Sequence, residues 1–242
     1  MYLLSFPNHK GYYFYSDTSG GPAENFLTAL DEVVSVFDRL HLWPGRPLNV
    51  LLDQVSPGPS CMKDACEIHL ATDLNHPSQA VYQFAHEYCH FNIPGQVCTS
   101  LRWLEESVCE MASHYCLRRL AVEVSYLTDH PALAAYAPRF RSYSDRILAA
   151  AAAADFTDST RLQRLESDCY RRDENQTAAA LLLPLFEAAP VLWKAVPCLS
   201  GVPEGFDAVN SASIWRELSP PETRRALDQL RRELYLLRIS AR

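Results

Sequence analysis

The hydrophobic pattern of the chain changes at about residue 75, and this change limits the folds that the chain can adopt. Before that point, short β-prone segments at 12–15, 48–52 and 66–71 lie on either side of a helical pattern at about 23–40. After Asn75, apolar residues recur with the helical period almost everywhere. Strands and helices that are separated in this way along a chain indicate an α+β fold.

The second part of the chain contains six expected helices. Their ranges are 77–92, 100–128, 142–154, 160–170, 176–195 and 220–239. No internal repeat and no obvious linker divides the chain. We therefore expect a small mixed β-sheet subdomain at 1–74 with an edge strand, followed by a mainly helical subdomain at 75–242, with one cleft shared by the two.

Charge and composition exclude some classes of partner. The 242 residues carry a formal net charge of -7, and the arginine pairs are spread out among acidic residues. This pattern argues against a nucleic-acid partner. The most apolar stretch, 178–199, contains Glu187, Lys194 and three prolines, so we expect no membrane span. The sequence does not determine the oligomeric state.

The N-terminal sequence predicts a cytoplasmic protein. Residues 1–7 lack the basic segment that begins an export signal, and the apolar run stops at Pro7. The eight cysteines are an even number that could pair. Without export, however, reduced thiols are the default, and we expect most of them to pack as small hydrophobic side chains.

A His-Glu-Tyr-Cys-His segment lies within the expected helix 77–92. His86 and His90 are four residues apart, so their imidazoles project from one helix face. This spacing lets one nitrogen of each ring reach a single zinc ion. Glu87 is turned by about 100° around the helix axis, where its carboxylate can reach a zinc-bound water without binding the metal. We interpret Cys89 as a packed small residue.

The next expected helix offers a third ligand. It follows a break at Pro94 and Gly95, which folds the chain back toward the histidine helix. One side of it is apolar, at Leu101, Leu104, Val108, Met111 and Tyr115. The roughly opposite side carries Glu106, Cys109, Glu110 and Ser113. A helix of this kind presents carboxylates to its neighbour.

Two other residues compete with Glu106 for the third ligand position. Glu105 lies beside it but off the stripe that carries Glu110. His114 is the first histidine after His90, and it is not on the Glu106 face. Geometry thus favours Glu106, without excluding these two.

The motif HExxH followed by Trp-Leu-x-Glu at 103–106 resembles the gluzincin metallopeptidases, the thermolysin-like and aminopeptidase-like clan. The resemblance covers about residues 83–116. It implies a zincin-like fold with one zinc ion per chain, and Glu106 as the third ligand. It also implies that Glu110 steadies His86 from outside the ligand shell. Where the family has glycine after the ligand, this chain has Ser107.

The resemblance further implies hydrolysis of peptide bonds by a metal-activated water. Glu87 would then be the general base, and a downstream tyrosine would stabilise the oxyanion. Tyr170 matches that position best, because it precedes a polar stretch and a long apolar helix. Its competitors are Tyr143, Tyr136 and His130.

The strand at 66–71 is the expected substrate-binding element. It alternates apolar and polar residues, which suits a strand with one wet face at a sheet edge. An extended peptide would add to it beside Glu67, Ile68 and His69. The Gly-x-Met-Glu-Asn signature of the aminopeptidase branch is absent from the sequence, which leaves aminopeptidase activity without support.

Two other functions remain open from the sequence. One is a catalytically inactive, peptidase-like binding module, and the other is a zinc hydrolase that acts on a non-peptide substrate. The presence of Glu87 favours an enzyme, because zinc binding alone does not require that carboxylate.

Overall fold

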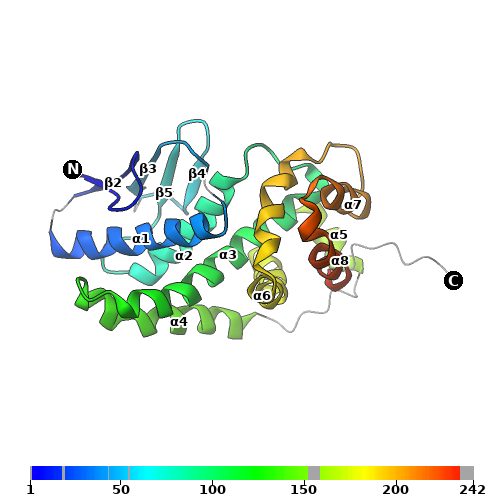
Figure 1. Ribbon diagram of the computed structural model, residues 1–242. Helices are drawn as coiled ribbons and strands as arrows, with labels where there is room; N and C mark the ends of the chain where they lie inside the picture. The colour runs from blue at the N-terminus through cyan, green and yellow to red at the C-terminus, as the bar shows by residue number, and fades with distance from the viewer. Residues whose placement is uncertain (1, 18–19, 43, 54, 152–158, 235–242) are drawn as a thin grey trace. The chain divides into compact units, whose positions relative to one another are not determined.

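A computed structural model describes residues 2–17, 20–42, 44–53, 55–151 and 159–234. The fold is α+β, as expected from the sequence. Five strands form one mixed sheet in the N-terminal part, and helices make up most of the remaining chain (Figure 1). The zincin-like character of the fold stays a prediction.

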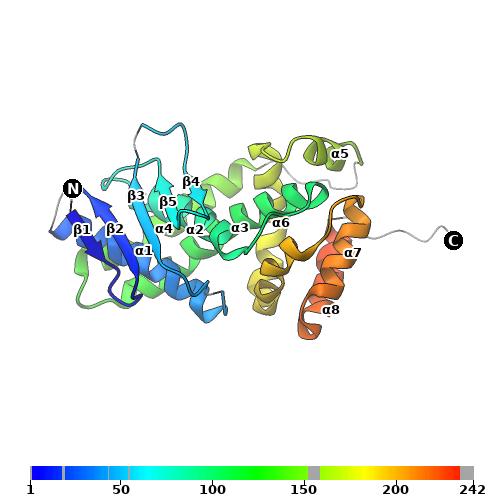
Figure 2. The same cartoon turned by 90° about the horizontal axis from the view of Figure 1, so that it is seen from above.

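The sheet has the strand order β1-β2-β3-β5-β4 (Figure 2). Its strands are β1 (Tyr2–Ser5), β2 (Tyr12–Ser16), β3 (Leu48–Leu52), β4 (Ser60–Met62) and β5 (Glu67–Leu70). The central strands β2, β3 and β5 run parallel, whereas β1 and β4 pair antiparallel at the two ends. The expected strands at 12–15, 48–52 and 66–71 are confirmed as β2, β3 and β5.

The expectation that the strand at 66–71 lies at a sheet edge is wrong. β5 pairs with β3 on one side and with β4 on the other, where Cys61 lies opposite Ile68. The edge strand is therefore β4. It is only three residues long, so it contains no period that a sequence pattern could reveal. The turn between β4 and β5 includes Cys66 at φ 56°.

Eight α-helices are present among the described residues. They are α1 (Gly21–Arg39), α2 (Pro77–Asn92), α3 (Arg102–Glu123), α4 (Pro131–Ala150), α5 (Ser159–Ser167), α6 (Arg172–Ala188), α7 (Ala208–Leu218) and α8 (Arg224–Glu233). Short 3₁₀ segments are η1 (Thr99–Leu101), η2 (Val124–Tyr126), η3 (Pro190–Gly201) and η4 (Pro221–Thr223). None of these described helices has the length and apolar character that a bilayer span requires.

The observed helices depart most from expectation in three places. α4 begins at Pro131 instead of residue 142, and its first residue suits the fixed φ of proline. Pro190 and Pro197 lie within the 3₁₀ segment η3, which replaces the expected end of the helix 176–195. α7 was not expected. Residues 152–154 and 235–239, which we also expected to be helical, lie outside the described residues.

The chain separates into two compact units. The first comprises Met1–Arg39, Trp43–Phe91 and Ala112–Ile147, and the second comprises Leu40–Leu42, Asn92–Met111 and Leu148–Arg242. Helices α2 and α3 contribute residues to both units. The subdivision into 1–74 and 75–242 stays a prediction, because compactness alone does not show which segments fold together.

The core of the first unit fixes the rotation of α2 about its axis. Tyr12 and Phe14 point to the same face of β2. Phe14 stacks on Phe26 of α1 with ring centroids 5.4 Å apart. The hydroxyl of Tyr12 lies 3.0 Å from that of Tyr88 on α2, and Tyr88 meets the ring of Phe37 edge to face at 5.0 Å. Both helices therefore pack on the same face of the sheet.

Candidate metal centre

The two histidines of the motif lie on the less buried side of α2. Ala85, Tyr88 and Cys89 have no exposed surface, whereas His86 and His90 are half-buried. The two imidazole rings have centroids 5.0 Å apart. Packing of the buried side against the core thus holds both imidazoles on one face, as the spacing of four residues predicts.

Helix α3 is aligned with α2 through a buried hydrogen bond. The hydroxyl of Ser113 donates to the carbonyl oxygen of Tyr82, at 2.8 Å. Tyr82 lies one turn before His86 on α2. Glu106 lies seven residues before Ser113 on the same continuous α3, which corresponds to two turns or about 10 Å.

His86, His90 and Glu106 form a cluster that can hold a metal ion. Each offers one ligand atom, and these atoms all lie within 4.8 Å of one another. Three ligand atoms at about 2.1 Å from one tetrahedral zinc would lie ~3.4 Å apart. The cluster therefore fits such an ion after small rotations of half-buried side chains. Two imidazoles and a carboxylate are a donor set that zinc accepts.

The two competitors for the third ligand position do not belong to this cluster. Among the described residues, the metal-binding group includes Glu106 and neither Glu105 nor His114. His114 is completely buried, and its Nδ1 lies 3.1 Å from the hydroxyl of Ser144 on α4. The ring of His114 also meets that of Tyr82 edge to face.

Two further acidic side chains of these helices are buried. Glu87 is 7% exposed and Glu110 is 4% exposed. Ionised carboxylates are costly to bury unless polar or charged groups compensate them. Their burial on α2 and α3, close in sequence to the cluster residues, is consistent with the roles expected from the sequence. The roles themselves stay predictions.

Tyr170 lies near Glu106 but is largely exposed. It is 75% exposed and precedes α6. Its pKa is raised by the adjacent Cys169 thiolate, by partial burial and by the Glu106 carboxylate. Burial and the same carboxylate also raise the pKa of the Cys169 thiol. The expected role of Tyr170 at the oxyanion stays a prediction. Its competitors Tyr136 and Tyr143 line a separate pocket on α4.

A hydrogen-bond link that the sequence analysis missed connects α3 with α6 and with the segment before α6. The hydroxyl of Ser107 lies 3.1 Å from Oδ1 of Asn175, and Nδ2 of Asn175 donates to the carbonyl of Cys169 at 2.7 Å. Ser107 and Asn175 are both buried. This link gives a physical reason for serine at 107, because glycine would offer no hydroxyl. No local sequence pattern signals this contact, because 68 residues separate Ser107 from Asn175.

The residues expected to bind substrate lie on opposite faces of β5. Ile68 is completely buried in the core, so its side chain cannot line a cleft. Glu67 and His69 point to the other face, where Oε2 of Glu67 lies 3.2 Å from Nε2 of His69. Nδ1 of His69 also lies 3.7 Å from a carboxylate oxygen of Asp53. Backbone pairing of a peptide with β5 at these residues is excluded, since β4 already pairs there.

Comparison with known proteins identifies no relative. The chain matches no protein family, no curated protein and no solved structure at a significant level.

Proposed function

We propose that this protein is a zinc-dependent peptidase in which His86, His90 and Glu106 hold the metal. The observation that supports the proposal is the convergence of these three side chains, with ligand atoms within 4.8 Å of one another. Three protein ligands leave the fourth position of a tetrahedral zinc open, which is the arrangement of catalytic zinc sites rather than structural ones. A zincin-like fold, with the HExxH helix packed on a mixed sheet, forms part of the proposal.

The proposed chemistry assigns proton transfer to Glu87. Zinc, when bound, supplies a water molecule that is nucleophilic near neutral pH. A carboxylate oxygen of Glu87 would take the proton of the attacking water. The same oxygen would then deliver this proton to the nitrogen of the leaving amine. General acid–base catalysis of this kind contributes about 10²–10⁴ in rate.

Glu110 and Tyr170 have supporting roles in the proposal. Along α3, Glu110 is one turn beyond Glu106. Its buried carboxylate would accept the N–H of the imidazole nitrogen that does not face the metal, and so keep the ring oriented. The phenol of Tyr170 would donate to the developing oxyanion of the substrate carbonyl.

The substrate would be a peptide that binds along β4 rather than β5. β4 is the terminal strand of the sheet next to β5, and its residues Ser60 and Met62 are exposed. The outer edge of a terminal strand offers N–H and C=O groups to an extended chain. Main-chain hydrogen bonds along β4 would then replace those that we expected along β5.

Metal content measured by plasma mass spectrometry tests the proposal. Protein purified without chelators and reconstituted with zinc should carry about one zinc per chain. Glu106→Ala should carry much less. Glu105→Ala provides a matched control, because it removes the neighbouring carboxylate of the same helix, and it should retain zinc. Loss of zinc in Glu105→Ala but not in Glu106→Ala would contradict the ligand set, and a zinc-free wild type would contradict the function.

A further inference from the structure

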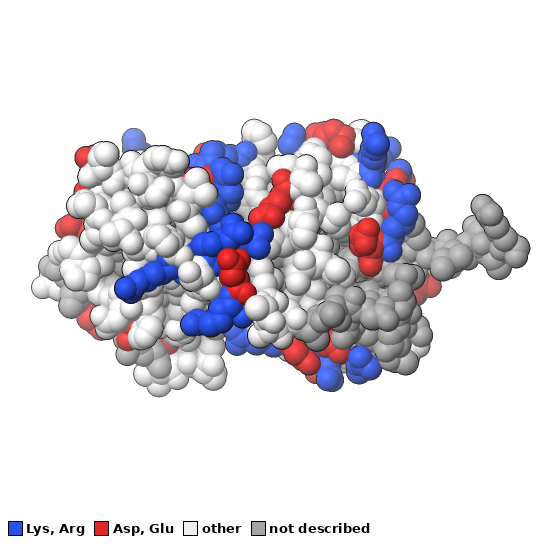
Figure 3. All heavy atoms as spheres, turned by 90° about the horizontal axis from the view of Figure 1, so that it is seen from below, with Lys and Arg blue, Asp and Glu red and all other residues white. Residues whose placement is uncertain are grey.

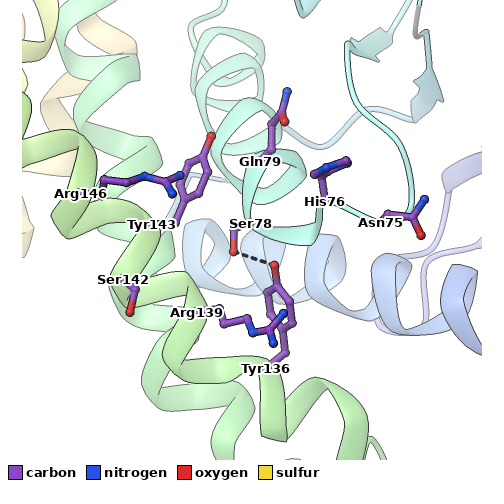
Figure 4. A pocket seen from close by; sticks show the side chains of 9 residues that line it. All are labelled: Asn75, His76, Ser78, Gln79, Tyr136, Arg139, Ser142, Tyr143 and Arg146. Atoms are coloured by element: carbon purple, nitrogen blue, oxygen red, sulfur yellow. Dashed lines mark hydrogen bonds between the residues drawn. The ribbon is translucent and has the colours of Figure 1, made fainter.

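A pocket of about 470 Å³ lies within the first unit, where the first turn of α2 faces α4 (Figure 4). Ser78 and Gln79 line it from α2, and Tyr136, Arg139, Tyr143 and Arg146 line it from α4. The hydroxyl of Ser78 donates to that of Tyr136 at 3.2 Å, which joins the two helices across the pocket. The pocket shares no residue with the metal cluster.

The arginines of the pocket are held by aromatic rings. Tyr136 and Arg139 are followed seven residues later by Tyr143 and Arg146, so both pairs lie on the same face of α4. Cζ of Arg139 lies 5.2 Å from the centroid of the Tyr136 ring, and Cζ of Arg146 lies 5.0 Å from that of Tyr143. Such contacts orient a guanidinium and leave its N–H groups available to a ligand.

Acidic side chains are absent from the described lining of this pocket. Within the described ranges, neither Arg139 nor Arg146 is ion-paired. The neighbouring Arg141, in contrast, pairs with Asp145 at 3.1 Å. Figure 3, seen from the side on which α4 lies in Figure 1, shows a band of Lys and Arg side chains with few acidic ones among them. On a chain of net charge -7, this is a local positive field.

The first turn of α2 adds further donors. The backbone N–H groups of Ser78 and Gln79 have no intrahelical acceptor, because they belong to the first turn. No acidic residue occupies that turn. The nearest acid along the chain is Asp73, which is engaged by the ring of His76 at 2.8 Å. The positive end of the helix dipole therefore adds to the charge of the two arginines.

We propose that this pocket binds a small organic molecule that carries an oxyanion, a phosphate or a carboxylate. The oxyanion would be held by Arg139, Arg146 and the first-turn N–H groups of α2. A volume of about 470 Å³ is that of an organic ligand rather than of an inorganic ion alone. The tyrosine rings would contact the organic part. This inference does not depend on zinc or on peptide hydrolysis.

Titration calorimetry with phenyl phosphate, benzoate and inorganic phosphate tests this proposal and distinguishes the two oxyanions. The expected result is binding of phenyl phosphate or benzoate to the full chain, with inorganic phosphate weaker than phenyl phosphate. The double variant Arg139→Gln/Arg146→Gln should bind at least about tenfold more weakly. Arg141→Gln, on the same helix but outside the pocket, should bind like the wild type. All three arginines are exposed, so these substitutions preserve the fold.

The same variants separate this pocket from the metal cluster. An anion that binds to zinc would bind the double variant as tightly as the wild type, and chelation would remove that binding. Equal affinities in the wild type and the double variant would therefore overturn the proposal. The absence of binding by all three compounds up to about 10 mM would also overturn it.

Discussion

At the scale of single residues, the proposed function depends most on Glu87. Glu87→Gln removes the base but preserves the size and the hydrogen-bonding capacity of a side chain that is only 7% exposed. We expect the variant to retain zinc and to lose at least about 10²-fold in kcat/KM on fluorogenic peptides. Full activity in this variant would refute the role of Glu87. A zinc-loaded wild type without turnover on broad peptide libraries would leave a zinc-binding module instead.

The buried link between Ser107 and Asn175 makes a separate prediction. Asn175→Ala leaves the carbonyl of Cys169 without its buried donor, so it should cost about 1–3 kcal/mol of unfolding free energy. Ser107→Ala should cost less, because its hydroxyl also lies 2.8 Å from the carbonyl of Trp103 within its own helix. In urea unfolding, the loss of unfolding free energy in the double variant should be smaller than the sum of the two single losses, by about 0.5 kcal/mol or more. Strict additivity would show that the two side chains are not coupled.

The sequence predicted those parts of the candidate site in which the contacting residues lie within a few positions of one another on one helix. His86, Glu87 and His90 follow from helical spacing alone, and the acidic stripe with Glu106 follows from the same period on α3. Asn175 was missed because 68 residues separate it from Ser107, and no local pattern carries such a contact. The arginine–tyrosine repeat on α4 has the period of a solvated helix face. The sequence did not reveal the pocket, because the pocket forms only where this repeat faces the first turn of α2.

At the scale of elements, the sequence predicted long helices better than short strands. α2 and α3 contain several turns of periodic residues, so they were expected close to their observed bounds. β4 has only three residues, and β1 has four, of which Tyr2 and Leu3 are half exposed. Pairing with a neighbouring strand stabilises such segments, and propensity does not reveal it. This is why β5 was wrongly placed at the edge of the sheet.

The contact between Tyr12 of β2 and Tyr88 of α2 predicts a specific dependence of stability on pH. Burial raises the pKa of Tyr12 from 10.0 to about 12, in spite of its hydrogen bond with Tyr88. Its contribution to stability is fully present below pH 10, where both states are protonated, and is lost as pH rises from 10 to about 12, because the unfolded chain ionises first. The loss should be about 2 kcal/mol.

Urea unfolding of the wild type and of Tyr12→Phe between pH 9 and about 12 measures this contribution of the Tyr12 phenol to stability. The variant lacks the ionising phenol, so its stability should fall less steeply over that interval. The lysines, and the tyrosines that do not contact Tyr12, titrate in both proteins, so their contributions cancel in the comparison. Parallel curves would show that the Tyr12 phenol ionises as easily in the folded chain as in the unfolded one.

At the scale of the whole molecule, metal binding and folding are linked. The three proposed ligands come from α2 and α3 and converge only when these helices are packed, so the unfolded chain offers no comparable site. At a thousandfold excess over its Kd, zinc should add about 4 kcal/mol to stability. For a chain of this length, each kcal/mol corresponds to about 2–4 °C in Tm. Removal of zinc by a chelator should therefore lower Tm by about 10 °C.

Glu106→Ala separates this effect from non-specific destabilisation by the chelator. Without the third ligand, the variant should melt near the temperature of the chelated wild type and respond little to added zinc. Glu105→Ala should retain the full zinc response. An equal response in Glu106→Ala would place the metal elsewhere in the chain. An unchanged Tm of the wild type after confirmed zinc removal would mean that the ion does not join α2 to α3, since an ion that bridges two helices must stabilise the state in which they pack.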